Sequence, residues 1–249
     1  MSEKNINLII TRQDSPESKP YKEEYSVPYR KNMNVISALM EIQKNPIDKD
    51  GKTTTPVVWE MNCLEEVCGA CSMVINGKAR QACSALIDHL VQPIRIEAMR
   101  TFPIIRDLMV DRSRMFDALK RVKAGIPIDG TYDLGPGPRL PERTRQWAYE
   151  LSKCMTCGVC LEVCPNVSEK TAFIGAQPIS QVRLFNVHPT GEMNKEERLE
   201  ALMGDGGATD CGNSQNCVQS CPKGIPLTTS IADINRQLTV YSFKKFFVN

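Results

Sequence analysis

The sequence predicts an α+β protein built from two domains, and three observations support this. The chain has 249 residues, a length typical of two domains. The first hundred residues combine short apolar runs of strand character with one helix-like segment, whereas the second half carries helix signals. The 11 cysteines fall into two groups with different spacing, one group in each half of the chain.

The N-terminal half predicts a β-grasp arrangement. Residues 5–11 and 23–29 predict two strands joined by a polar turn around Pro16. Asn34 is a suitable cap for a helix with apolar positions at a period near 3.6 residues, namely Val35, Ile36, Leu39 and Met40. Further short strands are expected at 72–75, 79–82 and 93–96.

The C-terminal half predicts helices. Residues 101–116 mix apolar and charged residues like a crossover, so we place the domains at 1–112 and 113–249. A surface loop at 127–141 precedes a helix at 142–153. Asn194 and Glu197 resemble a capping box for a helix that stops at Gly204, and Pro226 suits the first turn of a helix to about Gln237.

The overall charge points away from several classes of partner. With 31 basic and 29 acidic residues, the balance does not indicate nucleic acid or anionic lipid. No stretch reaches the length of a membrane span and the first residues do not resemble a secretory signal, so a soluble protein made in the cytosol is expected.

The first cysteine group has the spacing of plant-type ferredoxins, which bind a 2Fe-2S cluster. Its four members are Cys63, Cys68, Cys71 and Cys83. Gly69 and Ala70 leave the backbone little bulk there, so backbone N–H groups can point at the sulfurs and raise the cluster potential.

The second group contains the bacterial ferredoxin spacing, Cys154-x2-Cys157-x2-Cys160-x3-Cys164-Pro, followed by a matching half, Cys211-Gly-Asn-Ser214-Gln-Asn-Cys217-x3-Cys221-Pro. In this arrangement the fourth cysteine of each half belongs to the other cluster. A 4Fe-4S cluster is therefore expected on Cys154, Cys157, Cys160 and Cys221. Ser214 stands where a fourth cysteine would lie, so Cys164, Cys211 and Cys217 fit a 3Fe-4S cluster. A serine oxygen could fill the vacant corner, although thiolate is what selects iron–sulfur.

This assignment uses all 11 cysteines as sets of four, four and three. Disulfide frameworks are typical of short secreted chains, and structural zinc sites use ligands in sets of four, so neither is favoured by 11 cysteines in a chain of 249 residues. A zinc- or disulfide-stabilised interaction protein without a redox role is the alternative from another class. No catalytic acid–base or nucleophilic motif is present. The two histidines, His89 and His188, are interpreted as ordinary surface or hydrogen-bonded residues.

The three motifs in this order resemble the iron–sulfur subunits of succinate dehydrogenase and fumarate reductase, over essentially the whole chain. The stretches that carry the resemblance, beside the cysteine motifs, are 59–71, 105–111, 180–183, 210–217 and 221–230. In detail the chain most resembles the succinate:menaquinone oxidoreductase branch of Gram-positive bacilli.

The resemblance implies an electron-transfer subunit with no substrate-converting site of its own. A flavoprotein subunit with FAD oxidises succinate, electrons pass singly through the 2Fe-2S, 4Fe-4S and 3Fe-4S clusters, and a haem b membrane anchor reduces menaquinone. The chain would be peripheral on the cytoplasmic face of the cell membrane. A fumarate reductase running in the opposite direction is the near alternative.

Two features bear on how the chain meets the anchor. Ubiquinone-using relatives carry a tryptophan shortly after the first Cys-Pro and a histidine after the first cysteine of the second half. Here Asn166–Glu169 and Gly212 stand there, so no quinone ligands are assigned. The aromatic and basic tail, residues 240–249, is either a docking element for a membrane partner or a terminal helix packed on its own domain.

Overall fold

A computed structural model of the chain describes residues 5–126 and 139–248. The chain divides into two compact units. The first comprises Met1–Arg112 together with Met155–Glu162, and the second Ser113–Cys154 together with Val163–Asn249. The division after Arg112 coincides with the boundary placed from the sequence, but residues 155–162 were placed in the second domain and pack with the first unit. Most of the predicted loop at 127–141 lies outside the described residues.

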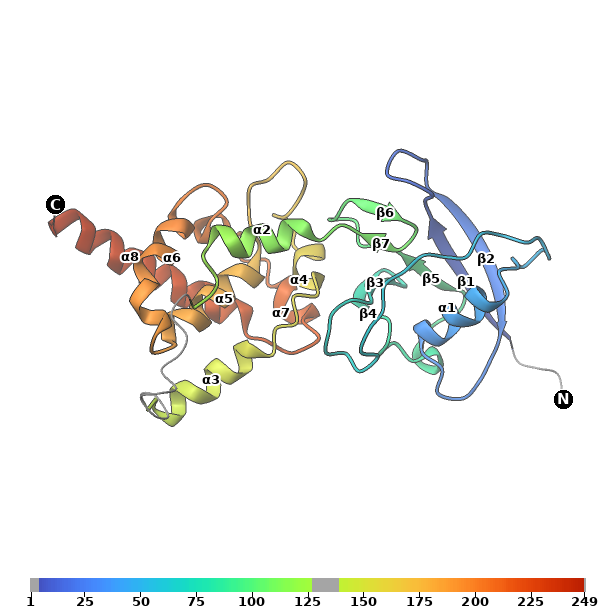
Figure 1. The fold of residues 1–249 in the computed structure, drawn as a ribbon, viewed down its shortest axis with the longest axis horizontal. Helices are drawn as coiled ribbons and strands as arrows, with labels where there is room; N and C mark the ends of the chain where they lie inside the picture. The colour runs from blue at the N-terminus through green and yellow to red at the C-terminus, as the bar shows by residue number, and fades with distance from the viewer. Residues whose placement is uncertain (1–4, 127–138, 249) are drawn as a thin grey trace. The chain divides into compact units, whose positions relative to one another are not determined.

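The first unit is a five-stranded sheet with a helix, α1 (Val35–Lys44), packed against it (Figure 1). Its strands are β1 (Asn5–Arg12), β2 (Tyr21–Pro28), β3 (Ser72–Ile75), β4 (Lys78–Gln81) and β5 (Ile94–Glu97), in the order β2-β1-β5-β3-β4. Strands β1 and β5 are parallel, and the other neighbours are antiparallel. The alternating apolar residues of β1 (Ile6, Leu8 and Ile10) are fully buried, as the period of two residues requires.

Helix α1 spans Val35–Lys44 and confirms its predicted start. The side chain of Asn34 accepts a hydrogen bond from the Ser37 N–H at 2.8 Å, which satisfies one free donor of the first turn. Val35, Leu39 and their apolar neighbours are buried against the sheet. Met40 was expected on this face but is 38% exposed, because the buried stripe centres on 35, 38, 39 and 42 and Met40 lies at its rim.

The predicted crossover at 101–116 contains a short hairpin, β6 (Ile104–Arg106) and β7 (Met109–Val110), before helix α2 (Ser113–Arg121) begins. Asp107, in the hairpin turn, forms a buried ion pair with Arg12 at the end of β1. Its carboxylate accepts from the Arg12 Nε at 3.1 Å and Nη2 at 2.9 Å, and from the Val58 N–H at 2.9 Å. Arg12 also contacts Glu23 at 2.6 Å. The hairpin is thereby fastened to β1 and to the chain that leads towards Cys63.

The second unit is helical. Its helices are α2 (Ser113–Arg121), α3 (Glu142–Ser152), α5 (Ala176–Val187), α6 (Lys195–Met203), α7 (Asn216–Ser220) and α8 (Leu227–Val248), with short 3-10 turns at Gly191–Asn194 and Ala208–Asp210. Helix α5 packs against α2, α3, α6 and α8 and is the centre of this unit. The helix predicted at 142–153 is present within one residue, and α6 ends before Gly204 as predicted.

The start of α6 differs in detail from a capping box. Asn194 precedes the helix, but its side chain makes no capping hydrogen bond to the backbone. Its Nδ2 instead donates to the Glu197 carboxylate at 3.0 Å. Residues 191–194 already form a 3-10 turn, so the chain does not enter the helix from the extended conformation that an N-cap requires.

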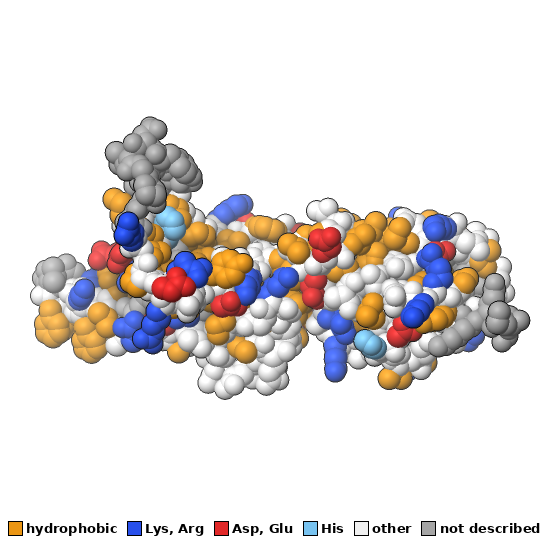
Figure 2. Space-filling model, turned by 90° about the horizontal axis from the view of Figure 1, so that it is seen from below, with side chains coloured by type: hydrophobic (Ala, Val, Ile, Leu, Met, Phe, Trp, Pro, Cys, Tyr) orange, Lys and Arg blue, Asp and Glu red, His pale blue; other side chains and the backbone are white. Residues whose placement is uncertain are grey.

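Helix α8 corrects the prediction of an end near Gln237, because it continues to Val248. No glycine or proline follows Pro226 to stop it. Glu200 of α6 accepts from Tyr241 at 2.8 Å and from Lys245 at 2.7 Å, so the last turns also contact their own unit. Phe246 and Phe247 are 79% and 78% exposed, and Figure 2 shows hydrophobic side chains gathered at this end of α8. Among the described helices, none has the length and hydropathy to cross a membrane.

Asp233 joins α8 to α5. Its carboxylate accepts from Arg183 of α5 at 3.2 Å and from Arg236 and Gln237 of α8 at 2.9 and 2.8 Å. Burial acts to raise the pKa of Asp233, but the hydrogen bonds from Arg236 and Gln237 and the charge of Arg183 outweigh it. The pKa of this carboxyl is therefore below its usual value.

Candidate metal centres

The first cysteine group lies in a loop whose backbone wraps around the sulfur of Cys63. The N–H groups of Glu65, Val67 and Cys68 donate to Cys63 Sγ at 3.4, 3.3 and 3.3 Å. The Ala70 N–H donates to Cys68 Sγ at 3.4 Å. These amide dipoles stabilise a thiolate, so the pKa of Cys63 falls to about 7. The N–H donors that the sequence analysis expected around these sulfurs are thus present.

The other two thiols of this group are buried. Cys71 lies just before β3 and Cys83 just after β4, two strands that pair with each other. Burial raises the pKa of Cys83 to about 11, helped by a hydrogen bond with Cys71 and by the charge of Cys63. The four side chains therefore converge from one loop and one strand pair. Binding of iron would require the buried thiols to lose their protons, as metal thiolates do.

Arg112 fixes this loop, a role that was not predicted from the sequence. Its Nη1 donates to the Gly69 carbonyl at 2.8 Å, and its Nη2 to the Ala70 carbonyl at 3.3 Å and to the Glu60 carboxylate at 2.5 Å. A single arginine far along the chain thus satisfies two carbonyls that the cysteine loop leaves outside any strand. Charge and sequence position alone carry no signal for this role.

In the second unit, Cys164, Cys211 and Cys217 lie together. Burial is the largest cause of the raised pKa of Cys217, and the charges of Cys164 and Cys211 add to it, which places all three thiols in one neighbourhood. These are the three residues that the spacing selects for the 3Fe-4S cluster. Thiolate is the ligand type that iron–sulfur clusters require, so the donor set fits the group.

Two asparagines tie the two half-motifs together. Asn166, two residues after Cys164, donates from Nδ2 to the carbonyl of Asp210, just before Cys211, at 2.8 Å. Asn216, just before Cys217, donates from Nδ2 to the carbonyl of Val163, just before Cys164, at 3.0 Å. The two bonds are reciprocal and fix the spacing of the half-motifs beside their cysteines. This function of both asparagines was not predicted from the sequence.

Gly212 is part of the same arrangement. A Cβ at this position would lie 3.0 Å from both terminal atoms of the Asn166 amide. The absence of a side chain after Cys211 therefore leaves room for the Asn166 bond. Any larger residue at position 212 would press against the end of the Asn166 side chain, which would have to shift by a few tenths of an ångström.

The backbone supports the alignment of Ser214 with Cys157. Thr156 and Gly158, on either side of Cys157, have left-handed φ values of 51° and 86°. Asn213 and Gln215, on either side of Ser214, have φ values of 53° and 64°. Left-handed backbone is uncommon outside glycine, so its recurrence at both matched positions indicates one loop conformation used twice.

The four cysteines predicted to bind the 4Fe-4S cluster are divided between the units. Cys157 and Cys160 belong to the first, and Cys154 and Cys221 to the second. Their assignment to one cluster rests on spacing and stays a prediction. Over the described ranges, no three His, Cys, Asp or Glu side chains are arranged to hold a single metal ion. An iron–sulfur cluster is larger than one ion, and its thiolates bind different irons.

Neither histidine joins a cysteine group. His89 ends a 3-10 turn, Ile87–His89, and is exposed. His188 is exposed as well, and its Nδ1 lies 3.0 Å from Thr190 Oγ1 and accepts from the Gly191 N–H at 3.4 Å. Its local hydrogen bonds agree with the expectation of an ordinary histidine.

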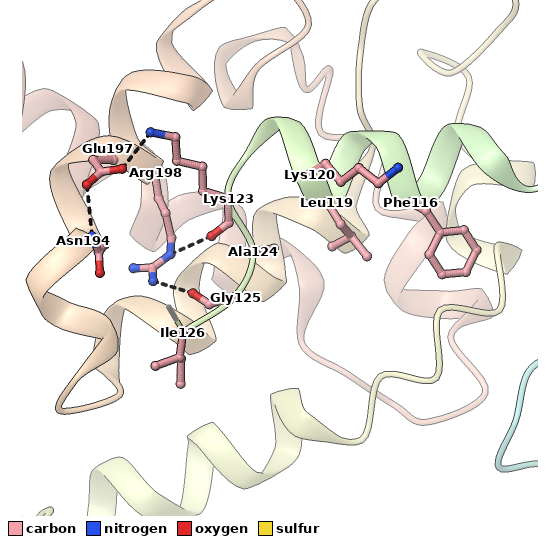
Figure 3. A pocket seen from close by; sticks show the side chains of 10 residues that line it. All are labelled: Phe116, Leu119, Lys120, Lys123, Ala124, Gly125, Ile126, Asn194, Glu197 and Arg198. Carbon is pink, nitrogen blue, oxygen red and sulfur yellow. Dashed lines mark hydrogen bonds and ion pairs between the residues drawn. The ribbon is translucent and has the colours of Figure 1, made fainter. Parts of the chain in front are cut away.

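The second unit also contains an open pocket of about 580 Å³ between α2 and α6 (Figure 3). The buried Arg198 donates to the carbonyls of Lys123 and Gly125 at 3.1 and 2.7 Å, so it organises the wall of the pocket. The rest of the lining is mostly apolar and contains no cysteine: Phe116, Leu119, Lys120, Ala124, Ile126, Asn194 and Glu197.

Comparisons with known proteins agree with the two cysteine groups. Residues 7–117 match the family model of a 2Fe-2S iron–sulfur cluster binding domain, and residues 150–225 that of a 4Fe-4S dicluster domain. The succinate dehydrogenase iron–sulfur subunit of Bacillus subtilis (strain 168) is 73% identical over 99% of this chain and 98% of its own length. The chain belongs to the succinate dehydrogenase iron–sulfur subunit family.

More distant relatives also match this chain over most of its length. The fumarate reductase iron–sulfur subunit of Mycobacterium tuberculosis is 30% identical over 92% of this chain and 90% of its own length. One subunit in a structure of the Mycobacterium smegmatis Sdh1 complex in the apo form superposes with a TM-score of 0.78 at 22% identity, covering 97% of this chain and 98% of that one. This likeness confirms the predicted α+β fold.

Membership of this family confirms an electron-transfer subunit of an oxidoreductase. The predicted cofactors agree with it: the family models name the 2Fe-2S and 4Fe-4S types, and succinate dehydrogenase iron–sulfur subunits carry a 3Fe-4S cluster as well. The family also implies a complex with a flavoprotein subunit and a membrane anchor. The non-redox zinc alternative does not agree with these matches.

Proposed function

We propose that this chain carries single electrons away from succinate oxidation in a succinate:menaquinone oxidoreductase. Electrons would enter from the FAD of the flavoprotein subunit and leave to a haem b anchor that reduces menaquinone. The chain would lie on the cytoplasmic face of the cell membrane. The observation that carries this proposal is the 73% identity to a bacillar succinate dehydrogenase subunit over almost the whole chain.

The ligands of the three clusters are proposed from spacing, with local geometry in support. The 2Fe-2S cluster would take Cys63, Cys68, Cys71 and Cys83. The 4Fe-4S cluster would take Cys154, Cys157, Cys160 and Cys221. The 3Fe-4S cluster would take Cys164, Cys211 and Cys217. When bound, the clusters supply sites that accept and release one electron at a time.

The residues of the chain would tune these potentials. Free plant-type ferredoxins have reduction potentials of about −400 mV, which are too low for them to accept electrons readily from a weak donor such as succinate. Three N–H groups point at Cys63 Sγ and one at Cys68 Sγ, and each favours the more negative, reduced state. At the last centre, three thiolates instead of four lower the negative charge and would raise the potential.

Low-temperature EPR of the protein in its native membrane tests the proposal. We expect a three-iron signal in the oxidised state and a two-iron signal that appears on addition of succinate. Clusters that only dithionite reduces would refute succinate as the donor. The absence of both signals would refute the ligand assignment.

The direction of electron flow is the remaining alternative, because fumarate reductase subunits are also relatives, at 26% to 30% identity. The same chain of clusters conducts both ways. The ratio of succinate oxidation activity to fumarate reduction activity, measured in membranes, distinguishes the two directions. We expect succinate oxidation to dominate.

A further inference from the structure

Gly69 lies in the 2Fe-2S loop, between Cys68 and Cys71, and a second cysteine motif packs directly onto it. A Cβ at this position would lie 2.8 Å from the carbonyl oxygen of Met155 and 2.9 Å from both Cα and Cβ of Cys157. Ordinary van der Waals contact begins at 3.4 Å, so each of these distances is about 0.5 Å too short for a side chain. Gly69 and residues 155–162 belong to the same compact unit.

Both sides of this contact are held in place. The Gly69 carbonyl accepts from Arg112 Nη1 at 2.8 Å and from Ser72 Oγ at 2.9 Å. On the other side, the Glu162 carboxylate, at the end of α4 (Val159–Glu162), accepts from the Thr101 N–H at 2.9 Å. The loop and the 155–162 segment are therefore bonded independently to the same unit, so moving either one to admit a methyl group would strain these bonds.

The left-handed backbone of Gly69 does not by itself explain why other residues pack so closely against it. Gly69 has a φ of +74°, which favours glycine at any position. Gly77, in the turn between β3 and β4, has nearly the same φ, +78°, but nothing lies within 4 Å of a Cβ built there. The two positions share the backbone requirement, and only Gly69 has the close contact.

We propose that Gly69 sets the spacing between the 2Fe-2S and 4Fe-4S centres. It is flanked by two proposed ligands of the first centre, and its missing side chain lets the backbone of Cys157, a proposed ligand of the second, lie against the loop. Gly69 is a positioning residue in the electron path, with Arg112 fixing its carbonyl. This inference rests on the cluster ligands given under Proposed function.

The test compares Gly69→Ala with Gly77→Ala in the assembled complex. EPR would record each cluster signal and the faster spin relaxation of the reduced 2Fe-2S cluster when the neighbouring 4Fe-4S cluster is also reduced, an effect that decreases steeply with distance. We expect Gly77→Ala to keep both signals and the enhanced relaxation. Gly69→Ala should keep the two-iron signal but weaken the relaxation enhancement, or lose the four-iron signal.

Three outcomes would overturn the inference. Gly69→Ala with wild-type signals and relaxation would show that the contact sets no distance. Equal changes in both variants would assign the effect to backbone strain. Wild-type protein without one of the two signals would refute the ligand assignment, and this inference with it.

A second variant applies if Gly69→Ala fails to assemble. Arg112→Gln removes the charged donor from the Gly69 carbonyl without adding an atom at the contact. We expect the two-iron signal to remain and the relaxation enhancement to weaken. Unchanged relaxation in Arg112→Gln, with Gly69→Ala unable to assemble, would overturn the inference.

Discussion

The buried ion pair between Arg12 and Asp107 makes a strong prediction for stability. Both side chains are fully buried, and Asp107 accepts two hydrogen bonds from Arg12 and one from the Val58 N–H. Asp107→Asn preserves the shape of the side chain and one acceptor oxygen. It leaves the buried Arg12 guanidinium without the negative charge of Asp107. Breaking a buried pair costs about 3–5 kcal/mol. Because Glu23 still contacts Arg12 at 2.6 Å, we expect Asp107→Asn to lower the free energy of unfolding by about 3 kcal/mol, the lower end of this range.

The exposed ion pair between Lys49 and Glu24 provides the matched control. Its atoms are also 2.9 Å apart, but the two side chains are 54% and 52% exposed. Exposed pairs contribute little to stability because solvent screens them, so Glu24→Gln should lower the melting temperature far less than Asp107→Asn does. The comparison separates the effect of burial from that of the pair itself, because both variants replace a carboxylate by its amide.

Thermal unfolding of the full chain with its clusters measures both variants. In a chain of this size 1 kcal/mol shifts Tm by roughly 2–4 °C, so Asp107→Asn should lower it by roughly 6–12 °C. Circular dichroism in the far ultraviolet and in the cluster absorption bands, at one scan rate, would follow the sheet and the 2Fe-2S site together. A shift in Asp107→Asn no larger than that in Glu24→Gln would refute the reasoning.

Three further predictions concern the second unit. Ser214→Cys should convert the three-iron centre to a four-iron centre of lower potential; an unchanged three-iron EPR signal would show that residue 214 does not face the vacant corner. Asn166→Ala should broaden or weaken the three-iron signal while the two-iron signal persists, and wild-type spectra would remove Asn166 from the site. Because the folded-state pKa of Asp233 is lowered, the ionised carboxylate stabilises the folded protein fully at pH values above its unfolded-state pKa of about 3.9. This stabilisation is lost as the pH falls through the lower folded-state pKa. Asp233→Asn should therefore be less stable than wild type near neutral pH, with the difference vanishing in acid; a pH-independent difference in helical circular dichroism melts would contradict this.

Much of the local structure was determined by the sequence. Asn34 caps α1 because the capping bond joins residues three positions apart. The alternation of Ile6, Leu8 and Ile10 predicts a buried strand face because side chains repeat every two residues. The cysteine spacing predicts clusters because the ligands of one loop must reach one group of irons. The end of α8 was missed because its polar and aromatic last turns carry no periodic signal, and Glu200 of another helix holds them.

Contacts between distant segments were decided only by the tertiary structure. Arg12 and Asp107 are 95 positions apart, and their pairing follows from the place where the β6–β7 hairpin meets β1. The role of Gly69 depends on residues 155–157, which the sequence assigned to the other domain. Asn166 and Asn216 are ordinary polar residues until the two half-motifs come together. Spacing and periodicity report which residues share a loop or a face. They contain no information on which surfaces meet, because that depends on how the whole chain packs.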